Sequence, residues 1–208
     1  MEGRRNPFVA REGIPFLFVT AVAFGFALQY LDVVVTVSLG LLFFVLFLVF
    51  RDPRRIIPAS PLGVVSPVDG RVLKIEVVDR GVLQGEAHIV HIRIDSLGTY
   101  TARAPVEGQI RDLRSVAHET KGDYSTNALW VQTDEGDDVV VRFEGYRFGF
   151  PPKSFIGLGQ RVGQGQRCAY LRLTRVAEVH LPIDTKVLVK PGQVLEAGTD
   201  LLGKLTHR

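Results

Sequence analysis

The sequence predicts a β-rich domain, built as a barrel or sandwich with pseudo-repeated strand–turn hairpins, preceded by an N-terminal transmembrane or re-entrant helical hairpin. Two observations lead to this prediction. The first is a stretch of lipid-like composition, residues 14–50, in which Asp32 is the only charged residue. The second is a series of short apolar runs beyond Arg51, separated by Gly and Pro, which is typical of strands joined by tight turns.

Composition divides the 208 residues into four segments. They are a basic N-terminal flank (1–13), a hydrophobic membrane hairpin (14–50), a basic juxtamembrane linker (51–57) and a β-rich domain (58–208). Since there is no arginine-rich run with interleaved aromatic residues, we expect no nucleic-acid partner. The single cysteine, Cys168, excludes an intramolecular disulfide.

The hydrophobic segment consists of two apolar runs, Ile14–Leu31 and Val33–Phe50, each of 18 residues. A membrane span needs roughly 17–25 such residues, so each run is long enough. One continuous helix would be roughly 55 Å long, whereas the hydrocarbon core is about 30 Å thick. We therefore expect a hairpin with its tip near Asp32, and a shallow re-entrant pair is the alternative.

Arginines flank the hydrophobic segment on both sides. Arg4, Arg5 and Arg11 precede it, and Arg51, Arg54 and Arg55 follow it. Positive residues at both ends predict that both ends lie on the cytoplasmic side. Each arginine near the surface contributes about 1 kcal/mol of attraction to anionic headgroups. We expect a protein of the cell (inner) membrane, with its soluble domain in the cytoplasm, membrane phospholipids as partners, and Arg51, Arg54 and Arg55 as lipid-binding residues.

The region from residue 58 onward alternates apolar and polar residues in short runs, which predicts strands. The runs are VVSPVDGRVLKIEVV, HIVHIRI, ALWVQT, DVVVRFEG, CAYLRL and KVLVKPG, with further alternation through residues 171–175 and only a weak helical pattern over residues 110–118. Two short repeats suggest pseudo-symmetric halves. Pro67-Val68-Asp69-Gly70 is repeated as Pro105-Val106-Glu107-Gly108, and Gly159-Gln160 with Gly165 is repeated as Gly192-Gln193 with Gly198.

Other chemical sites are not favoured by the sequence. His88 and His91 are three residues apart, so on a strand they point to opposite faces and do not predict a metal site. The run GLGQRVGQGQ lacks Gly-Lys-Ser/Thr, so its glycines are read as turn residues and not as a nucleotide loop. We predict no metal.

Several phrases together carry a resemblance to a known family. They are REGIPF (11–16), FRDPRRIIP (50–58), VVSPVDGRVLKI (64–75), RAPVEGQI (103–110), GQRVGQGQ (159–166) and VHLP (179–182). In this order they resemble the phosphatidylserine decarboxylase family, in its short prokaryotic form. The resemblance implies a membrane-attached, β-rich decarboxylase that acts on the serine headgroup of a phospholipid. It also implies self-cleavage at a Gly-Ser bond, which leaves a pyruvoyl group that condenses with the substrate amine and serves as an electron sink.

Of the residues that the family uses in self-cleavage, the resemblance implies that some are kept here and others are replaced. The family's aspartate corresponds to Asp69, within Ser66–Gly70, whereas Tyr100 occupies the position of its histidine. When Leu181-Pro182 is used as the anchor, Thr174 and Arg175 occupy the Gly-Ser cleavage position. No Gly-Ser dipeptide occurs anywhere in the chain, and the two Gly-Thr dipeptides, at 98–99 and 198–199, lie elsewhere. The sequence therefore predicts no self-cleavage and no pyruvoyl cofactor.

Three functions follow from this reading. The first is a degenerate family member without pyruvoyl-dependent activity, acting in phospholipid binding, scaffolding or regulation of phospholipid metabolism, alone as a homo-oligomer or with an active relative. The second is an active decarboxylase with a displaced site, and the third is a non-lipid membrane adaptor that reuses the fold. Arg103, which lies in a family phrase, is expected either to hold a lipid phosphate or to form a structural ion pair with Asp69 or Glu107.

Overall fold

The computed structural model describes residues 8–79, 82, 85–111, 128–145 and 151–206. The chain forms two compact units. The first comprises Met1–Arg54 together with Leu97–Tyr100, and the second comprises Arg55–Ser96 together with Thr101–Arg208. The short segment Leu97–Tyr100 thus joins the N-terminal unit, although more than forty residues separate the two in sequence.

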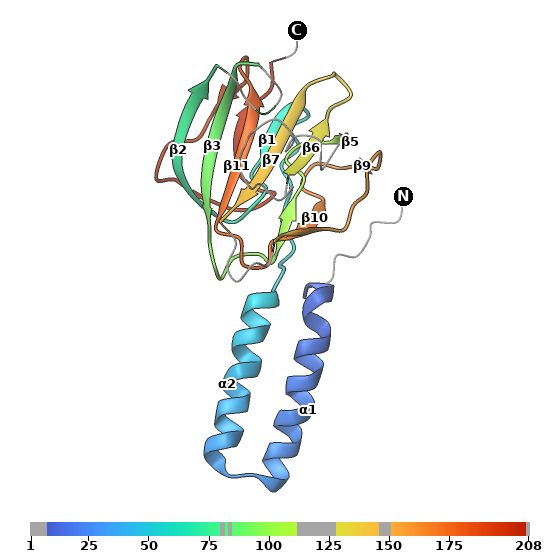
Figure 1. Ribbon diagram of the computed structural model, residues 1–208, viewed down its shortest axis with the longest axis vertical. Coiled ribbons are helices and arrows are strands. Elements are labelled where there is room, and N and C mark those ends of the chain that lie inside the picture. The colour runs from blue at the N-terminus through green and yellow to red at the C-terminus, as the bar shows by residue number, and fades with distance from the viewer. Residues whose placement is uncertain (1–7, 80–81, 83–84, 112–127, 146–150, 207–208) are drawn as a thin grey trace. The chain divides into compact units, whose positions relative to one another are not determined.

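The first unit is a helical hairpin (Figure 1). Its elements are a 3-10 turn η1 (Arg11–Gly13) and the helices α1 (Ile14–Tyr30) and α2 (Val33–Phe50). Proline in the first turn of α1 costs no helical hydrogen bond, because the N–H that proline lacks would have no helical partner there. The two helices match the two predicted apolar runs to within one residue, and Asp32 lies in the connection between them.

The helices pack through small residues and expose apolar side chains elsewhere. The Thr36 hydroxyl donates to the carbonyl of Ala27 across the hairpin at 3.1 Å. A Cβ on Gly13 would lie 2.2 Å from Cγ of Phe50, so only glycine allows this approach. Large side chains such as Phe18 (69% exposed) and Val33 (77% exposed) face outward. Both helices are long enough and apolar enough to cross a membrane, judged by length and composition.

The second unit is made of antiparallel strands in three sheets (Figure 1). The largest has eight strands in the order β13-β2-β3-β11-β7-β6-β5-β9, and the two others have the orders β1-β14-β12 and β4-β10-β8. The strands are β1 (Gly63–Val65), β2 (Gly70–Val78), β3 (Ala87–Ile94), β4 (Thr101–Arg103), β5 (Gly108–Ile110), β6 (Ala128–Gln132), β7 (Asp138–Glu144), β8 (Lys153–Ser154), β9 (Arg161–Val162), β10 (Arg167–Tyr170), β11 (Val176–Pro182), β12 (Lys186–Val187), β13 (Val194–Leu195) and β14 (Leu201–Lys204).

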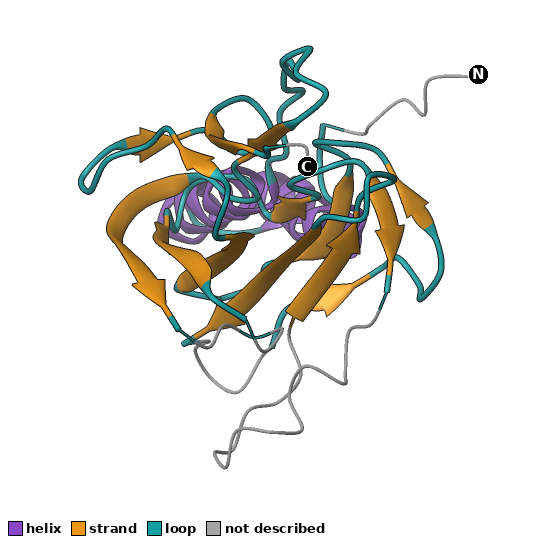
Figure 2. Ribbon diagram, turned by 90° about the horizontal axis from the view of Figure 1, so that it is seen from above, coloured by secondary structure: helices purple, strands orange, loops and turns teal. Residues whose placement is uncertain are grey.

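All three sheets contribute to one apolar core. Val64 of β1, Ala102 of β4 and Val179 of β11 are fully buried in the same cluster. The long strands of the large sheet lie along one side of this unit, and shorter strands lie opposite (Figure 2). The prediction of a β-rich domain is confirmed. Among the described residues none of the sheets closes on itself, so the finer prediction of a barrel is not confirmed.

The sequence repeat is also a repeat of hydrogen bonds. The backbone N–H two residues before each repeated proline donates to the carbonyl of the other proline. Val65 donates to Pro105 at 2.9 Å, and Arg103 donates to Pro67 at 2.8 Å. These two bonds are reciprocal, so they relate the halves by a local pseudo-two-fold.

The glycine-turn repeat follows the same symmetry. The N–H of Gly198 donates to Ser66, and the N–H of Gly165 donates to Ala104, at 2.7 and 2.8 Å. Both acceptors directly precede a repeated proline. All four turn glycines have positive φ, between 69° and 85°: Gly159, Gly165, Gly192 and Gly198. Glycine adopts this left-handed backbone without the steric penalty that a Cβ brings.

The glycines that end the two Pro-x-acid-Gly phrases are sites of close backbone approach. A Cβ on Gly70 would lie 2.1 Å from the carbonyl oxygen of Arg93, and one on Gly108 would lie 2.1 Å from that of Gln132. Real Cβ atoms essentially never come this close. Each glycine therefore lets the strand that it begins cross closely over its neighbour.

Two strand predictions are wrong in detail. The alternation from Leu171 to Arg175 predicts a strand, but β10 ends at Tyr170 and β11 begins at Val176. Residues 171–174 form a tight turn, because Arg172 adopts a positive φ of 53° and Thr174 bonds back to Leu171. In the run at 186–192 only β12, two residues long, is a strand. Of the weak helical pattern over 110–118, Ile110 ends β5, and residues 112–118 lie outside the described residues.

The turn glycines offer a matched test of the packing. Replacement of Gly192 by alanine is expected to reduce the free energy of unfolding by about 1–2 kcal/mol, the cost of a left-handed residue with a Cβ. Gly198→Ala carries the same backbone cost, and its Cβ would also lie 2.8 Å from Cδ of the buried Arg103. Overpacking at Gly198 should reduce the free energy of unfolding by a further amount of about 1–3 kcal/mol. Thermal unfolding of the two variants in detergent compares them, and equal melting temperatures would contradict this account.

Candidate site at the end of β3

Asp69 and Arg175 each directly precede a strand that borders β3. Asp69 precedes β2 and Arg175 precedes β11, and these strands pair with β3 on its two sides. The N–H of Asp95 donates to the Asp69 carbonyl at 2.9 Å. The N–H of Ile94 donates to the Arg175 carbonyl at 2.8 Å. The structure therefore brings these two predicted site residues to the same end of the large sheet.

The carboxylate of Asp69 is held by a backbone amide and a guanidinium. Oδ1 accepts from the N–H of Ala197 at 2.6 Å, and Oδ2 accepts from Nη2 of Arg55 at 2.8 Å. Arg55 also reaches Glu196 at 3.0 Å. Asp69 is buried, and these contacts fix the orientation of its side chain. The retained aspartate thus has a defined structural position, and Arg55 is its ion-pair partner.

The Thr174 side chain belongs to the turn before β11. Its hydroxyl donates to the carbonyl of Leu171 at 2.6 Å, and its own N–H reaches the same carbonyl at 3.2 Å. Thr174 is buried, whereas Arg175 is exposed. The hydroxyl therefore points back into the turn, toward the carbonyl three residues earlier. A hydroxyl that attacks the carbonyl directly before it would have to leave this bond.

Tyr100 belongs to the first unit. Its hydroxyl donates to Oε2 of Glu12 at 2.9 Å, and its ring lies 4.8 Å from the ring of Phe50. The ring of Phe16 also stacks on that of Phe50, with centroids 5.8 Å apart. At this position the side chain therefore ties the start of α1 to the end of α2, which is a role in packing.

The four arginines predicted to bind lipid differ in their surroundings. Arg54 is exposed and Arg51 is half-buried, both just after α2. Nε of Arg51 is buried and has no hydrogen-bond partner in the described part of the chain. Arg55 is neutralised by Asp69 and Glu196, as described above. Arg51 and Arg54, unlike Arg55, form no ion pair with Asp69.

Arg103 lies inside the second unit. It is 1% exposed, and its Nη1 donates to the carbonyl of Gly165 at 3.1 Å. Gly198 leaves room for its aliphatic stem, since a Cβ there would lie 2.8 Å from Cδ. Burial raises the pKa of the neighbouring Cys168 thiol to about 12, although the Arg103 charge opposes that shift. Cys168 is therefore a buried thiol and no nucleophile at neutral pH.

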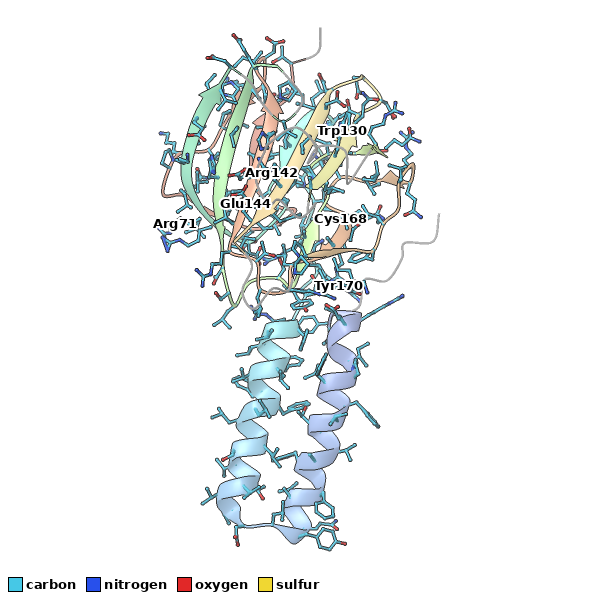
Figure 3. All side chains as sticks on the ribbon, viewed as in Figure 1. Arg71, Trp130, Arg142, Glu144, Cys168 and Tyr170 are labelled. Atoms are coloured by element: carbon cyan, nitrogen blue, oxygen red, sulfur yellow. The ribbon has the colours of Figure 1, made fainter. Side chains whose placement is uncertain are left out.

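A polar network that the sequence reading did not predict crosses the large sheet. Glu178 of β11 lies opposite His91 of β3 and opposite Arg142 of β7. Nδ1 of His91 lies 3.1 Å from Glu178, and its Nε2 lies 2.8 Å from Glu76. Figure 3 shows Arg142 and Glu144 along β7. In the sequence these polar residues occupy alternate positions of four separate runs. Only the order of the strands in the sheet shows that they lie next to one another.

The charges of this network act on Glu178. Burial disfavours the ionised carboxylate of Glu178, but the imidazole of His180, with Nε2 3.7 Å away, and the charges of Arg142 and His91 outweigh it. Together they hold the pKa of Glu178 below its ordinary value of 4.5. Hydrogen bonds from Lys74 and His91 likewise lower the pKa of Glu76. The network therefore favours ionised carboxylates on this sheet face.

Comparison with known proteins places the chain among decarboxylase relatives. A family model described as phosphatidylserine decarboxylase matches residues 41–203. A phosphatidylserine decarboxylase proenzyme of Symbiobacterium thermophilum is 33% identical, with 99% of each chain covered. The protein of the same name from Nitrosomonas eutropha is 30% identical, with 96% of each covered. A solved structure, the glucose permease IIA from Mycoplasma capricolum, aligns with a TM-score of 0.45 at 19% identity over 68% of this chain and 94% of that one.

The lowered pKa of Glu178 predicts a stabilisation that depends on pH. A carboxyl group whose pKa is lower in the folded state stabilises the fold above its unfolded pKa, and this is lost as the pH falls through the folded pKa. Glu178→Gln should therefore reduce stability by about 2 kcal/mol at pH 7. The two proteins should converge as the pH falls well below 4.5.

Thermal unfolding between pH 7 and pH 3 measures this difference. Glu107→Gln is the matched control, since Glu107 is 63% exposed and lies 3.7 Å from Arg161, a distance typical of a weak surface pair. A deficit of Glu178→Gln that persists unchanged in acid would show that the charge of Glu178 is not its cause.

Proposed function

We propose that this chain, which belongs to the phosphatidylserine decarboxylase family, is a membrane-anchored member that is not self-processed and forms no pyruvoyl group. In this proposal it binds phospholipid headgroups and acts in scaffolding or in regulation of phospholipid metabolism. The observation that carries this proposal is Arg175 at the position where self-cleavage needs a serine. In this family a pyruvoyl group supplies the electron sink for decarboxylation. It originates from a serine, whose hydroxyl attacks the preceding carbonyl.

The side chain of Arg175 cannot perform this step. A guanidinium carries five N–H donors and stays protonated, so it offers no nucleophilic oxygen. The nearest hydroxyl, that of Thr174, donates to the carbonyl of Leu171 at 2.6 Å and is buried. The residue before it is Leu173, and a bulky residue resists the strained geometry of an acyl shift more than glycine does. Both features support a chain that stays intact.

The position of the general base is changed as well. A nucleophilic hydroxyl is activated by an adjacent base that a third group orients. Asp69 is retained, but its carboxylate is engaged by Ala197 and Arg55. Tyr100 stands where the family has histidine, and its phenol donates to Glu12. A hydroxyl that donates its proton to a carboxylate is not placed to accept one from a nucleophile.

Phospholipid binding is supported by the helices and by the arginines that follow them. Two apolar helices of membrane-spanning length end at a basic segment containing Arg51 and Arg54. We place this segment and the β unit at the cytoplasmic face of the cell membrane, because positive residues flank both ends of the hairpin. A guanidinium pairs well with phosphate oxygens, so these two arginines are the proposed contacts of the headgroup. Arg103 would contribute only where a headgroup reaches the interior.

A second candidate function is an active phosphatidylserine decarboxylase with a displaced site. The names of the relatives favour it, since the proteins from Symbiobacterium thermophilum and Nitrosomonas eutropha are both called decarboxylase proenzymes. In that case the Thr174 hydroxyl would have to turn from Leu171 toward Leu173. The chain would then be cut between residues 173 and 174.

Intact mass distinguishes the two functions directly. The full chain, purified in detergent, is expected to give a single species with the mass of 208 residues. The variant Arg175→Ala should behave identically, because Arg175 has no chemical role in this proposal. Two fragments, one of them with a blocked N-terminus, would establish self-processing and support the second function.

Binding of a soluble lipid tests the headgroup contacts. Short-chain phosphatidylserine should bind the full chain more tightly than short-chain phosphatidylcholine does. Since each surface arginine contributes about 1 kcal/mol toward an anionic lipid, Arg51→Ala/Arg54→Ala should weaken binding at least about tenfold. Calorimetric titration in a neutral detergent measures both affinities.

The matched control for this test is Arg93→Ala/Arg161→Ala, which removes two exposed arginines from the β unit. It should leave the affinity for phosphatidylserine unchanged within about twofold, because salt screens charges that lie far from the bound lipid. Equal affinity for the two lipids, with no loss in either double variant, would favour a non-lipid membrane adaptor.

A further inference from the structure

A cavity of about 450 Å3 lies at the opposite end of the large sheet from Asp69 and Arg175. It is lined by the start of β3, the start of β7 and the end of β11. The candidate site described above lies at the end of β3 and the start of β11. Since these strands are antiparallel, the cavity and that site lie at opposite ends of the same strands. Its volume falls in the range of small-molecule pockets.

The cavity is lined by a buried histidine with unused hydrogen-bonding capacity. His180 is 5% exposed, and neither of its ring nitrogens makes a hydrogen bond of normal length. Its nearest ionic neighbour is Glu178, at 3.7 Å from Nε2. Its strand neighbours Val179 and Leu181 belong to the core, so His180 points to the other face of β11. A neutral imidazole offers one nitrogen as an acceptor.

A second buried polar group lines the same cavity. Thr185 is 4% exposed, and its hydroxyl has no hydrogen-bond partner in the described part of the chain. A buried polar group without a partner costs roughly 1–3 kcal/mol, so native proteins keep few of them. Two such groups, from neighbouring segments and around one cavity, indicate that a ligand completes their hydrogen bonds.

The charge of the lining indicates the sign of that ligand. Glu86, Glu135, Asp137, Asp138 and Asp184 contribute to the lining, whereas no lysine or arginine does so among the described residues. Glu86 and Glu135 are exposed at the rim. A concave surface with carboxylates of one sign concentrates cations. A ligand suited to this lining is a cation that also donates hydrogen bonds to His180 and Thr185.

The spread of the acidic groups argues for an organic cation. Among the described residues, no three His, Cys, Asp or Glu side chains converge closely enough to hold a metal ion. Apolar residues, including Val82 and Ile183, also line the cavity. Methylene groups fit against such side chains, while ammonium groups at the ends of a chain reach separate carboxylates. A polyamine has this combination of features.

We propose that this cavity is a binding site for an aliphatic di- or polyamine, in which ammonium groups donate to His180 and Thr185 and pair with the rim carboxylates. The site is separate from the headgroup function proposed above and does not depend on it. Its ligand is water-soluble, and its residues belong to the β unit alone. Occupation would stabilise this unit, since a ligand that binds only the folded state raises its stability.

Calorimetric titration of the full chain in neutral detergent with spermidine tests the proposal. Saturable binding and a rise in melting temperature are expected. The double variant Glu86→Gln/Glu135→Gln should weaken binding about tenfold, because two exposed charge pairs are removed. Both side chains are exposed, so the melting temperature without spermidine should not change.

The control is Glu107→Gln/Glu144→Gln, which removes the same number of carboxylates away from the cavity lining. It should leave the affinity for spermidine within about twofold of the original. Equal weakening in both double variants, or in neither, overturns the assignment to this cavity. Displacement of spermidine by an equal concentration of Mg2+ overturns the choice of an organic cation, and absence of binding overturns the site itself.

Discussion

The structure depends on one pair of reciprocal backbone hydrogen bonds. Val65 donates to the carbonyl of Pro105, and Arg103 donates to the carbonyl of Pro67, so each Pro-x-acid-Gly phrase is fixed by the other. Gly70 and Gly108 then let the following strands pass within a distance that no side chain permits. Proline fixes φ, which restricts the backbone of each phrase before its carbonyl accepts.

This arrangement separates the fold from the chemistry. The contacts that hold the end of β3 are made by backbone atoms, including the carbonyls of Asp69 and Arg175. A backbone carbonyl is available whatever the side chain, so an arginine at 175 preserves the contact with Ile94. The Thr174 hydroxyl adds a bond within its own turn. A chain can therefore keep this contact while its side chain at 175 changes.

The sequence predicted the elements well where the pattern is strong and local. The two apolar runs became α1 and α2 with ends within one residue, and the repeat of Pro67–Gly70 at Pro105–Gly108 is reproduced in the hydrogen bonds. The alternation at Leu171–Arg175 misled, because a period of two does not reveal the positive φ of Arg172. Tertiary contacts decide such a turn, and they are not visible in a short run.

The candidate site was predictable only in part. The resemblance located Asp69, but its ion pair with Arg55 connects residues from two phrases that the sequence reading treated separately. Arg103 was expected to hold a lipid phosphate or to form a structural ion pair, but the sequence did not reveal that it is 1% exposed or that Gly198 leaves space for its stem. The cavity at His180 and the network around Glu178 depend on strand order. Strand order follows from long-range pairing, which local patterns do not determine.

The central proposal is that this chain has the family's scaffold without its decarboxylation chemistry. The most direct measurement is release of labelled CO2 from phosphatidylserine that carries the label in its serine carboxyl group, with the purified full chain in mixed micelles. The account predicts no release above that of micelles without protein. Catalytic release that hydroxylamine, a reagent for reactive carbonyl groups, abolishes would contradict it.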